Sequence, residues 1–254
     1  MIFRLSLEQR IFFRSLCWQA SWNFSRMQNM GLAYAIYPLL EQLYGHDRTL
    51  LIKKIKGYLT FFNTNPIMAA AVLGIHVNLE KNGQGEYGLL LARNLNSLYG
   101  AIGDAFFWNG IKPALAALAV LIYYGGGGFW APVALLLGYN IFHLGIRYLI
   151  YIQGVRHGLE VVNTIHHWQL PKVKMIVNYL TTGLLAFCVP YLISTLFPTA
   201  AGPVCLQPFS LFTAGIIAFF AWQIKQGISI FRVLQYASLI VLAIMMLSHW
   251  LPFC

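Results

Sequence analysis

Charged side chains are scarce in this chain of 254 residues. Asp, Glu, Lys and Arg make up 9% of it, whereas 59% of the residues are hydrophobic. A typical soluble domain carries about 25% charged residues, so this chain has too little polar surface for a water-soluble fold. The composition therefore excludes a soluble enzyme. It predicts an all-α integral membrane protein, a multi-span helical bundle in which residues 1–254 form one membrane domain.

Acidic residues are the scarcer of the two charge types. The chain has seven Asp and Glu against seventeen Lys and Arg, for a formal net charge of +10. Membrane proteins keep an excess of Lys and Arg in their cytoplasmic loops, which accounts for the basic balance. No basic run is interleaved with aromatic residues, so we expect no nucleic-acid partner.

Signals for a disulfide framework, a metal site or a cleaved leader are also lacking. The four cysteines show no paired spacing: Cys17, Cys188, Cys205 and Cys254. The histidines His157, His166 and His167 are close in sequence, but no thiolate or carboxylate set joins them at ligand spacing. The amino terminus, "MIFRLSLEQRIFFRSL", has charges scattered through it and no cleavage-site pattern. We therefore predict no metal, no cofactor and no signal peptide.

Charge divides the chain into two halves. Residues 1–95 hold ten of the seventeen Lys and Arg and five of the seven acids. This half is predicted to form amphipathic and re-entrant helices. Residues 96–254 are predicted to form about five transmembrane spans, each within reach of the ~20 residues that a bilayer requires: 101–124, 131–152, 176–197, 209–224 and 233–253.

The loops between these spans alternate in charge. The loops at 125–132 and 198–208 have no charged residue, while the intervening loops hold Arg156, Lys172 and Lys174, then Lys225 and Arg232. This alternation predicts a multi-pass topology with the basic loops in the cytoplasm and the uncharged loops and carboxy terminus outside. The four glycines at 125–128 lack the spacing of a phosphate loop and are interpreted as a flexible turn.

Polar residues recur at helical spacing near the amino terminus. Between residues 12 and 30, Ser15, Gln19, Asn23 and Arg26 follow steps of four and three, so one helix would place them on one face. A helix lying in the membrane interface and a helix lining a ligand site both show such a stripe. Both alternatives remain open on spacing alone.

The stretch "FFNTNP" at 61–66 has the pattern of a helix start. Pro66 suits the first helical position, and Asn63, Thr64 or Asn65 can cap it. The apolar helix that follows spans about 15 residues, or roughly 22 Å, which is short of a bilayer. Short capped helices of this kind are typical of re-entrant segments at transporter binding sites. The alternative is a helix packed against the membrane face of the protein.

Asp104 lies at the start of the first long apolar stretch. Gly100 and Gly103 precede it and are interpreted as turn glycines, so that Asp104 would cap a helix beginning at Ala105. Pro113 is expected to interrupt that helix. A charge at membrane depth costs about 2.5–3.5 kcal/mol and persists where it faces a cavity or protein. The sequence thus predicts a pathway residue, or alternatively a cap near the cytoplasmic surface.

Four motifs in order carry a resemblance to a known family. They are "RSLCWQASWNFSRMQNMG" (14–31), "FFNTNP" (61–66), "GAIGDAFFWNGIKP" (100–113) and "YNIFHLGIRY" (139–148). Together the motifs resemble the IID membrane component of the mannose/fructose/sorbose family of sugar phosphotransferase systems. The resemblance covers about residues 10–160. It departs from the family pattern at Ser97 and Leu98, at Lys112 in place of arginine, and at Met175 in place of glutamate, which identifies a divergent member.

The resemblance, joined to sugar chemistry, implies a set of site residues. Amide and carboxylate groups answer the hydroxyl groups of a sugar, and an aromatic plane answers its ring face. The candidates for substrate binding or the translocation path are Trp22, Asn23, Arg26, Gln28, Asn63, Thr64, Glu80, Asp104 and Trp108. The residues assigned to shape the motifs are Pro66, Gly100, Gly103, Pro113 and Arg147. No catalytic residue is implied.

The resemblance also implies partners and a location. A IID subunit pairs with a IIC subunit in a trimer of heterodimers within the bacterial inner membrane, and passes a hexose in an elevator-like motion to IIB, which receives its phosphate through IIA. The chain would not be catalytic on its own, and its histidines would not accept phosphate. The alternative is a non-transporting assembly or regulatory membrane subunit that retains the IID fold.

Overall fold

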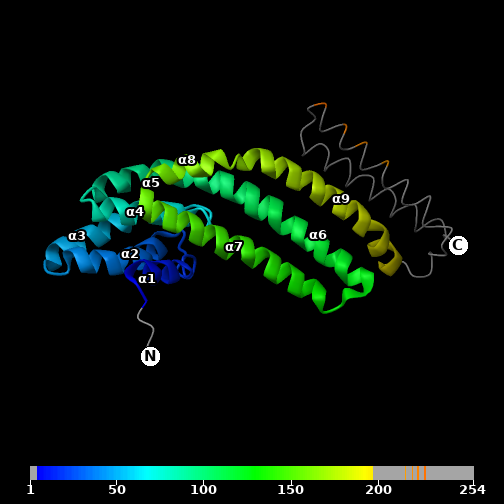
Figure 1. Cartoon of the computed structure of the whole chain (residues 1–254), viewed down its shortest axis with the longest axis horizontal. Helices are drawn as coiled ribbons and strands as arrows, with labels where there is room; N and C mark the ends of the chain where they lie inside the picture. The colour runs from blue at the N-terminus through cyan, green and yellow to red at the C-terminus, as the bar shows by residue number, and fades with distance from the viewer. Residues whose placement is uncertain (1–4, 197–214, 216–218, 220–221, 223–225, 227–254) are drawn as a thin grey trace. The chain divides into compact units, whose positions relative to one another are not determined.

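The computed structural model describes residues 5–196, together with residues 215, 219, 222 and 226 (Figure 1). Regular structure in residues 5–196 is helical throughout, and the only β-type pairing there is two isolated bridges. The all-α fold class is therefore confirmed for this part of the chain. The elements are α1 (Leu7–Ser15), α2 (Asn29–Tyr44), α3 (Arg48–Tyr58), α4 (Ala69–Lys81), α5 (Gly85–Gly103), η1 (Asp104–Ile111), α6 (Lys112–Ile122), η2 (Tyr123–Gly127), α7 (Trp130–His157), α8 (Glu160–His167) and α9 (Leu170–Leu196).

Helices α1 and α3 are short and begin at polar caps. Ser6 and Gln9 form a reciprocal capping box at the start of α1. The Asp47 carboxylate accepts hydrogen bonds from the amides of Thr49 and Leu50 at the start of α3. These caps satisfy amide groups that have no partner within the helix, so each helix has a defined first turn.

The helix expected across residues 12–30 does not form, and that expectation was wrong. α1 ends at Ser15, the chain turns through residues 16–28, and α2 begins at Asn29. Met27 has a positive φ of 55°, which a continuous right-handed helix excludes. The Asn23 side chain accepts from the Arg26 amide and donates to the Met27 carbonyl. Local bonds of this kind compete with the helical ladder.

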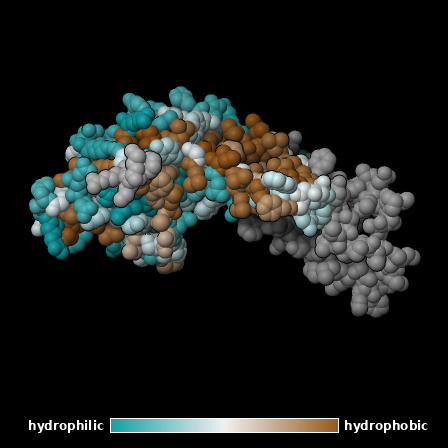
Figure 2. Space-filling view, turned by 60° about the horizontal axis from the view of Figure 1, so that its bottom comes forward, coloured by the Kyte–Doolittle hydropathy of each residue, from teal (hydrophilic) through white to brown (hydrophobic). Residues whose placement is uncertain are grey.

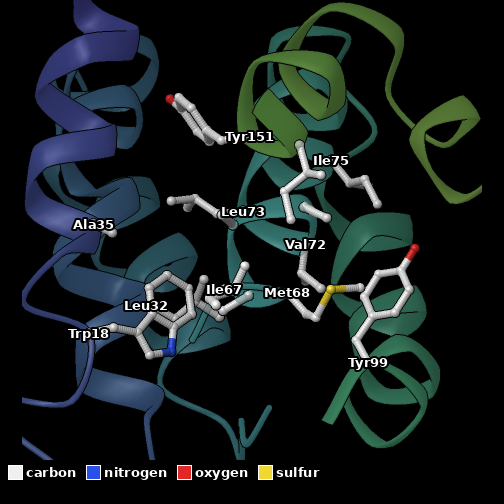
Figure 3. Close-up of a cluster of buried hydrophobic side chains, with 14 of the residues drawn as sticks. Trp18, Leu32, Ala35, Ile67, Met68, Val72, Leu73, Ile75, Tyr99 and Tyr151 are labelled. Atoms are coloured by element: carbon white, nitrogen blue, oxygen red, sulfur yellow. The ribbon is translucent and has the colours of Figure 1, made fainter. Parts of the chain in front are cut away.

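Helix α4 forms the centre of the core. Every residue from Ala69 to Glu80 is buried except Asn78. Side chains from α1–α2, α5 and α7 converge on it, including Leu32, Tyr99 and Tyr151 (Figure 3). A helix buried on all sides is in contact with protein rather than lipid or water. The alternative interpretation of this segment, a surface helix packed against the membrane face, is therefore wrong.

Two glycines let α4 cross α7 closely. A Cβ atom at Gly74 would lie 2.4 Å from the Tyr151 carbonyl oxygen and 2.9 Å from the Gly154 Cα. Backbone atoms cannot move aside as a flexible side chain can. The pair α4–α7, which makes the most extensive helix contact in the described part of the chain, therefore depends on small residues at the crossing.

Within the described residues, two helical segments are long and apolar enough to cross a membrane. The first, Gly85–Gly127, joins α5, η1, α6 and η2 without a break, and the second is α7. In Figure 1, α6 and α7 run side by side and are joined by the glycine turn at their far end. The predicted spans at 101–124 and 131–152 fall within these segments. The turn prediction is confirmed, since Gly126 and Gly128 have positive φ angles of 87° and 41°.

Only one of the three remaining predicted spans falls largely within the described residues. The span at 176–197 corresponds to α9, which is described to Leu196. The spans at 209–224 and 233–253 lie outside the continuously described residues. The charge-based division at residue 95 is not a break between helices, because α5 runs through it.

Hydrophobic surface follows the long helices. Figure 2 shows hydrophilic atoms over much of the end that contains α1–α5, and hydrophobic atoms over the membrane-length helices. The exposed apolar side chains on α7 include Leu136, Leu137 and Ile141, each at least 60% exposed. An exposed face made of such apolar side chains is suited to contact with lipid rather than water.

Candidate functional site

The first motif forms a folded loop rather than a helix. Asn23 holds the loop together: its side chain also donates to the Asn29 side chain, at 2.9 Å. Arg26 ties the loop to the segment after α3, since its guanidinium donates to the Leu59 carbonyl at 3.2 Å. The backbone of Gln28 then donates to the Phe62 carbonyl at 2.8 Å. These bonds bring the first and second motifs side by side.

Gln28 joins the loop to the second motif through its side chain. Its amide oxygen accepts from the Trp18 indole nitrogen at 2.9 Å and from the Thr64 backbone amide at 3.3 Å. Gln28 is 3% exposed and Trp18 is 1% exposed. Removing one partner of such a buried hydrogen bond leaves the other partner unsatisfied, which destabilises the fold. The Thr64 backbone is thereby fixed beside the loop.

Asn65 links the second motif to the third. Its side-chain oxygen accepts from the Ile67 amide at 3.0 Å, and its side-chain nitrogen donates to a carboxylate oxygen of Asp104 at 2.9 Å. Asn65, one of the three predicted capping residues, thus bonds to the turn before α4, while α4 itself begins at Ala69 without a side-chain cap. Pro66 follows it in the turn that leads into α4, where its missing N–H group costs no helical bond.

Gly103 allows this contact between α5 and the second motif. A Cβ atom at that position would lie 2.4 Å from the Asn65 Cβ and 2.8 Å from the Met68 Cγ. At Gly100 the nearest atom, the Thr64 Cα, would be at 3.6 Å, an ordinary contact. Close approach is thus required at Gly103 and not at Gly100.

The predicted capping role of Asp104 is wrong. Asp104 has helical angles (φ −64°, ψ −42°) inside the continuous segment from α5 to η2, so the amides that follow it already have helical partners. Gly103 is helical as well, and neither glycine makes a turn. The carboxylate bonds to Asn65 instead of to the backbone.

The predicted break at Pro113 is replaced by a change in helix type. Residues 104–111 form the π-helix η1, and the Lys112 amide donates to the Phe107 carbonyl five residues earlier. Pro113 then lies in the first turn of α6. The wider π turn absorbs the proline without breaking the helix. Such π segments are frequent at functional sites, and η1 begins at Asp104.

The three motifs enclose a polar cavity of about 450 Å³. Residues at four-residue steps on one helical face, Asn96, Gly100, Asp104 and Trp108, form one wall. The complete lining is Gln19, Trp22, Gln28, Phe61, Asn63, Thr64, Asn96, Ser97, Gly100, Ala101, Asp104 and Trp108. The α5–η1 face, the loop at 16–28 and the segment at 59–65 therefore share one chamber.

Two buried polar atoms in the lining have no hydrogen-bond partner among the described residues. They are the Thr64 hydroxyl oxygen and the Asn96 amide oxygen, and their residues are 5% and 4% exposed. Such atoms normally have a partner. A ligand or water carrying hydroxyl groups would satisfy them. Together with the half-buried Asp104 carboxylate, these oxygens are hydrogen-bond acceptors that line the cavity. The indole rings of Trp22 and Trp108 line it as well.

The structure places six of the nine predicted path residues on this cavity: Trp22, Gln28, Asn63, Thr64, Asp104 and Trp108. Asn23 and Arg26 do not line it and instead fold the loop that does. Glu80 is separate from the cavity and is 2% exposed. It accepts bonds from the Tyr44 and Tyr58 hydroxyls, each at 2.8 Å. Burial and the bond to Glu80 raise the pKa of Tyr44 to about 12.

Five residues of the lining were not among the predicted site residues: Gln19, Phe61, Asn96, Ser97 and Ala101. Asn96 had a usable signal, because it lies eight residues before Asp104 and therefore on the same face of a helix. Asn65, the partner of Asp104, was considered only as a cap. Its second role depends on a contact 39 residues away, which local spacing does not show.

Arg147 lies away from the cavity, at the packing of α7 against α1. It is 2% exposed and donates to the Ser15 carbonyl, so it holds the end of α1 just before the loop of the first motif. Among the described residues, no three His, Cys, Asp or Glu side chains form a group able to hold a metal ion.

Membrane-length apolar helices around a capped, buried half-length helix, with a polar cavity beside it, define a helical membrane protein. Residues 6–251 match the family model described as the PTS system mannose/fructose/sorbose family IID component. This match spans nearly the whole sequence, so the chain belongs to the IID component family of the mannose/fructose/sorbose phosphotransferase systems.

Individual relatives match over a shorter stretch. The chain is 32% identical over 159 residues to the mannose-specific EIID component of Escherichia coli K12, covering 60% of this chain and 56% of that protein. It is 30% identical over 158 residues to the fructose permease IID component of Bacillus subtilis, covering 60% and 57%. The aligned region thus spans little more than half the length of these relatives.

Solved structures support the fold. A chain in the cryo-EM structure of the mannose transporter ManYZ with microcin E492 aligns with a TM-score of 0.58 at 22% identity, covering 94% of this chain and 96% of that one. A second structure, titled only as a membrane protein, aligns with a TM-score of 0.64 at 23% identity, covering 96% and 97%. At these identities the likeness establishes the architecture.

Proposed function

We propose that this chain is the IID membrane subunit of a sugar permease and that, with a IIC subunit, it forms the pathway for hexose uptake coupled to phosphorylation by IIB. The observation that carries the proposal is the convergence of three family motifs on one polar cavity. Its volume of about 450 Å³ is in the usual range for small-molecule sites, about 300–1,000 Å³.

The cavity chemistry suits a sugar. The Asp104 carboxylate and the unpartnered oxygens of Thr64 and Asn96 can accept hydrogen bonds from sugar hydroxyls. Trp22 and Trp108, 52% and 41% exposed, offer indole surfaces to a sugar ring. In this proposal the chain binds and conducts the sugar, and the phosphotransfer belongs to IIA and IIB.

The IIC partner would complete the chamber. Aromatic side chains beside the cavity are unusually exposed, with Phe24 at 87% and Phe61 at 55%. Exposed aromatic residues are enriched in protein–protein interfaces. In the assembly we propose, this surface contacts IIC, three heterodimers associate in the bacterial inner membrane, and an elevator-like motion carries the hexose across. The two membrane-length helical segments support a multi-pass arrangement.

Asp104→Asn tests the proposal. The asparagine keeps an oxygen that can accept from Asn65, so the fold is retained, but it loses the charge. Membrane vesicles containing the IIC partner, with IIA and IIB supplied, should show phosphoenolpyruvate-dependent hexose uptake. We expect Asp104→Asn to reduce this uptake roughly tenfold or more, the effect of weakening a hydrogen bond to a charged group.

Glu86→Gln is the matched control, because Glu86 is an exposed carboxylate on the same helix, α5, and does not line the cavity. It should leave uptake unchanged. If Asp104→Asn transports as well as the wild type, or if the wild-type complex assembles without any uptake, the chain is instead a non-transporting assembly or regulatory subunit. Co-purification with IIC separates loss of transport from loss of assembly.

A further inference from the structure

A second hollow lies on another face of α5, against α8 and the start of α9. It has a volume of about 420 Å³ and a lining that is almost entirely apolar. Leu98, Tyr99 and Ile102 contribute from α5, and Val162 and Ile165 from α8. A smaller hollow of about 330 Å³ shares Ile102, Leu170 and Pro171 with it and continues along η1 past Ala105 and Phe106. We call the two together the α5–α9 groove.

Basic side chains line both hollows of the α5–α9 groove. His166 and Lys172 line the larger hollow, and Lys174 lines the smaller one. None of the lining residues is acidic. Among the described residues, the only ion pair within 4.0 Å joins Lys81 to Glu8, so neither lysine is neutralised by a carboxylate there. The groove thus combines an apolar channel with uncompensated positive charge.

A buried donor also lines the groove. Tyr99 is 1% exposed, and its hydroxyl has no hydrogen-bond partner among the described residues. Burial without a partner costs a polar group free energy. A ligand with an ester or phosphate oxygen in the groove would accept from this hydroxyl, whereas a purely hydrocarbon ligand would leave it unsatisfied.

The order of residues fits the depth profile of a bilayer. Lys172 and Lys174 stand at the start of α9, immediately before its apolar stretch from residue 176. Leu98, Ile102 and Phe106 follow one another along the membrane-length segment Gly85–Gly127. Lysines just before an apolar stretch suit the headgroup region, and the apolar residues that follow them suit the hydrocarbon.

We propose that the α5–α9 groove is a binding site for an anionic phospholipid of the cytoplasmic leaflet. The lipid phosphate lies against Lys172, Lys174 and His166, and an acyl chain follows Ile102, Ala105 and Phe106. Anionic lipids are recognised by basic residues at this depth, and the charge of the groove selects them over zwitterionic lipids. The site is separate from the polar cavity and does not depend on the sugar that the permease carries.

Native mass spectrometry of the full-length protein, with its membrane partner, tests the site. Phosphatidylglycerol or phosphatidylcholine would be added in equal amounts to the delipidated complex in detergent. We expect phosphatidylglycerol to be retained, and Lys172→Gln with Lys174→Gln to weaken its binding roughly twenty-five-fold, because each lysine near an anionic headgroup accounts for about fivefold. Ala105→Phe, which fills the smaller hollow, should also reduce retention of phosphatidylglycerol without changing the charge of the groove.

Lys53→Gln with Lys56→Gln is the matched control, since it removes two positive charges from the exposed face of α3. It should leave retention unchanged. The proposal is overturned if both double variants lose lipid equally, or if phosphatidylcholine is retained as strongly as phosphatidylglycerol. It is also overturned if inorganic phosphate alone displaces the lipid, because the site would then bind a free phosphate and not a lipid. Thermal unfolding of each variant identifies any that fail to fold. In place of such a variant, short-chain phosphatidylglycerol is added to the wild-type protein, where it should displace the bound phosphatidylglycerol.

Discussion

At the scale of single residues, His76 shows how the core controls ionisation. It is completely buried in α4, neither ring nitrogen has a hydrogen-bond partner among the described residues, and its ring contacts Tyr58 edge-to-face at 5.1 Å. Burial lowers the pKa of His76 from 6.5 to about 4, because a charged imidazolium has no solvation there. The folded protein therefore holds this residue neutral.

Stability should fall in acid because of His76. Between pH 6.5 and about 4 the unfolded chain binds a proton that the folded protein excludes, so the free energy of unfolding decreases as the pH is lowered through this window. The total loss is about 3 kcal/mol, and above pH 6.5 the contribution is complete. Thermal unfolding in detergent across this range measures it.

His76→Leu should flatten that pH dependence, while Glu8→Gln should not. The bond to Lys81 lowers the pKa of Glu8, so its contribution is lost only as pH falls below the usual carboxylate range. If His76→Leu and the wild type lose stability in parallel between pH 6.5 and 4, His76 is not the residue that titrates.

Residue chemistry was predictable from the sequence where it depended on near neighbours. Local pattern drew attention to the side chain before Pro66, which bonds to the Ile67 amide, and to Asp104, which lines the cavity. The bond between Asn65 and Asp104 did not, because it joins segments 39 residues apart. Glu80 had the right chemistry for a sugar, but two tyrosine hydroxyls already occupy it, and periodicity carries no information about such partners.

At the scale of helices, close packing of α5 on the second motif depends on Gly103. A Cβ atom there would lie 2.4 Å from the Asn65 Cβ, whereas one at Gly100 would meet nothing nearer than 3.6 Å. Gly103→Ala should therefore destabilise the protein by about 1–3 kcal/mol through overpacking. Gly100→Ala should be neutral or stabilising by up to about 1 kcal/mol, since alanine favours the helix.

Thermal unfolding of the two alanine variants, one turn apart on α5, provides the comparison. Equal effects, or a larger loss at Gly100, would contradict the packing described here. The same contact explains why the sequence misled about these glycines. Glycine is common both in turns and where helices approach closely, and only the position of Asn65 distinguishes the two uses.

The sequence predicted the long apolar helices correctly, but it predicted a helix wrongly at residues 12–30. Long apolar runs gave the membrane-length helices, because hydrophobicity over about 20 residues is a strong signal. Residues 12–30 had equally regular polar spacing but form a loop. There the Asn23 side chain bonds to backbone groups of Arg26 and Met27 that a helix would use, and spacing does not show this competition.

At the scale of the whole molecule, charge in the loops predicts the orientation in the membrane. Phe129 is 76% exposed in the uncharged turn between η2 and α7, and Lys172 lies in the basic first turn of α9. In a variant with all four native cysteines replaced, Phe129→Cys should react with a membrane-impermeant maleimide in intact cells. Lys172→Cys should react only after the cells are permeabilised. The reverse pattern would invert the topology.

The family, the membrane class and the helical architecture were all predictable from the sequence, because they rest on composition and on four ordered motifs. The cavity itself was not, since it is assembled from a loop, a capped segment and one face of α5. Its polar residues are separated by up to 89 positions between Gln19 and Trp108. Only folding brings them to one chamber.

The most direct test of that chamber is protection of a cysteine within it. Ser97 lines the cavity and is exposed, so Ser97→Cys in the cysteine-free background should react readily with a maleimide in the purified complex. Saturating mannose, fructose or sorbose should slow this reaction several-fold for at least one sugar, while labelling of Thr49→Cys, exposed on α3, stays the same. Labelling of Ser97→Cys that is unaffected by every sugar carried by the complex would contradict the account.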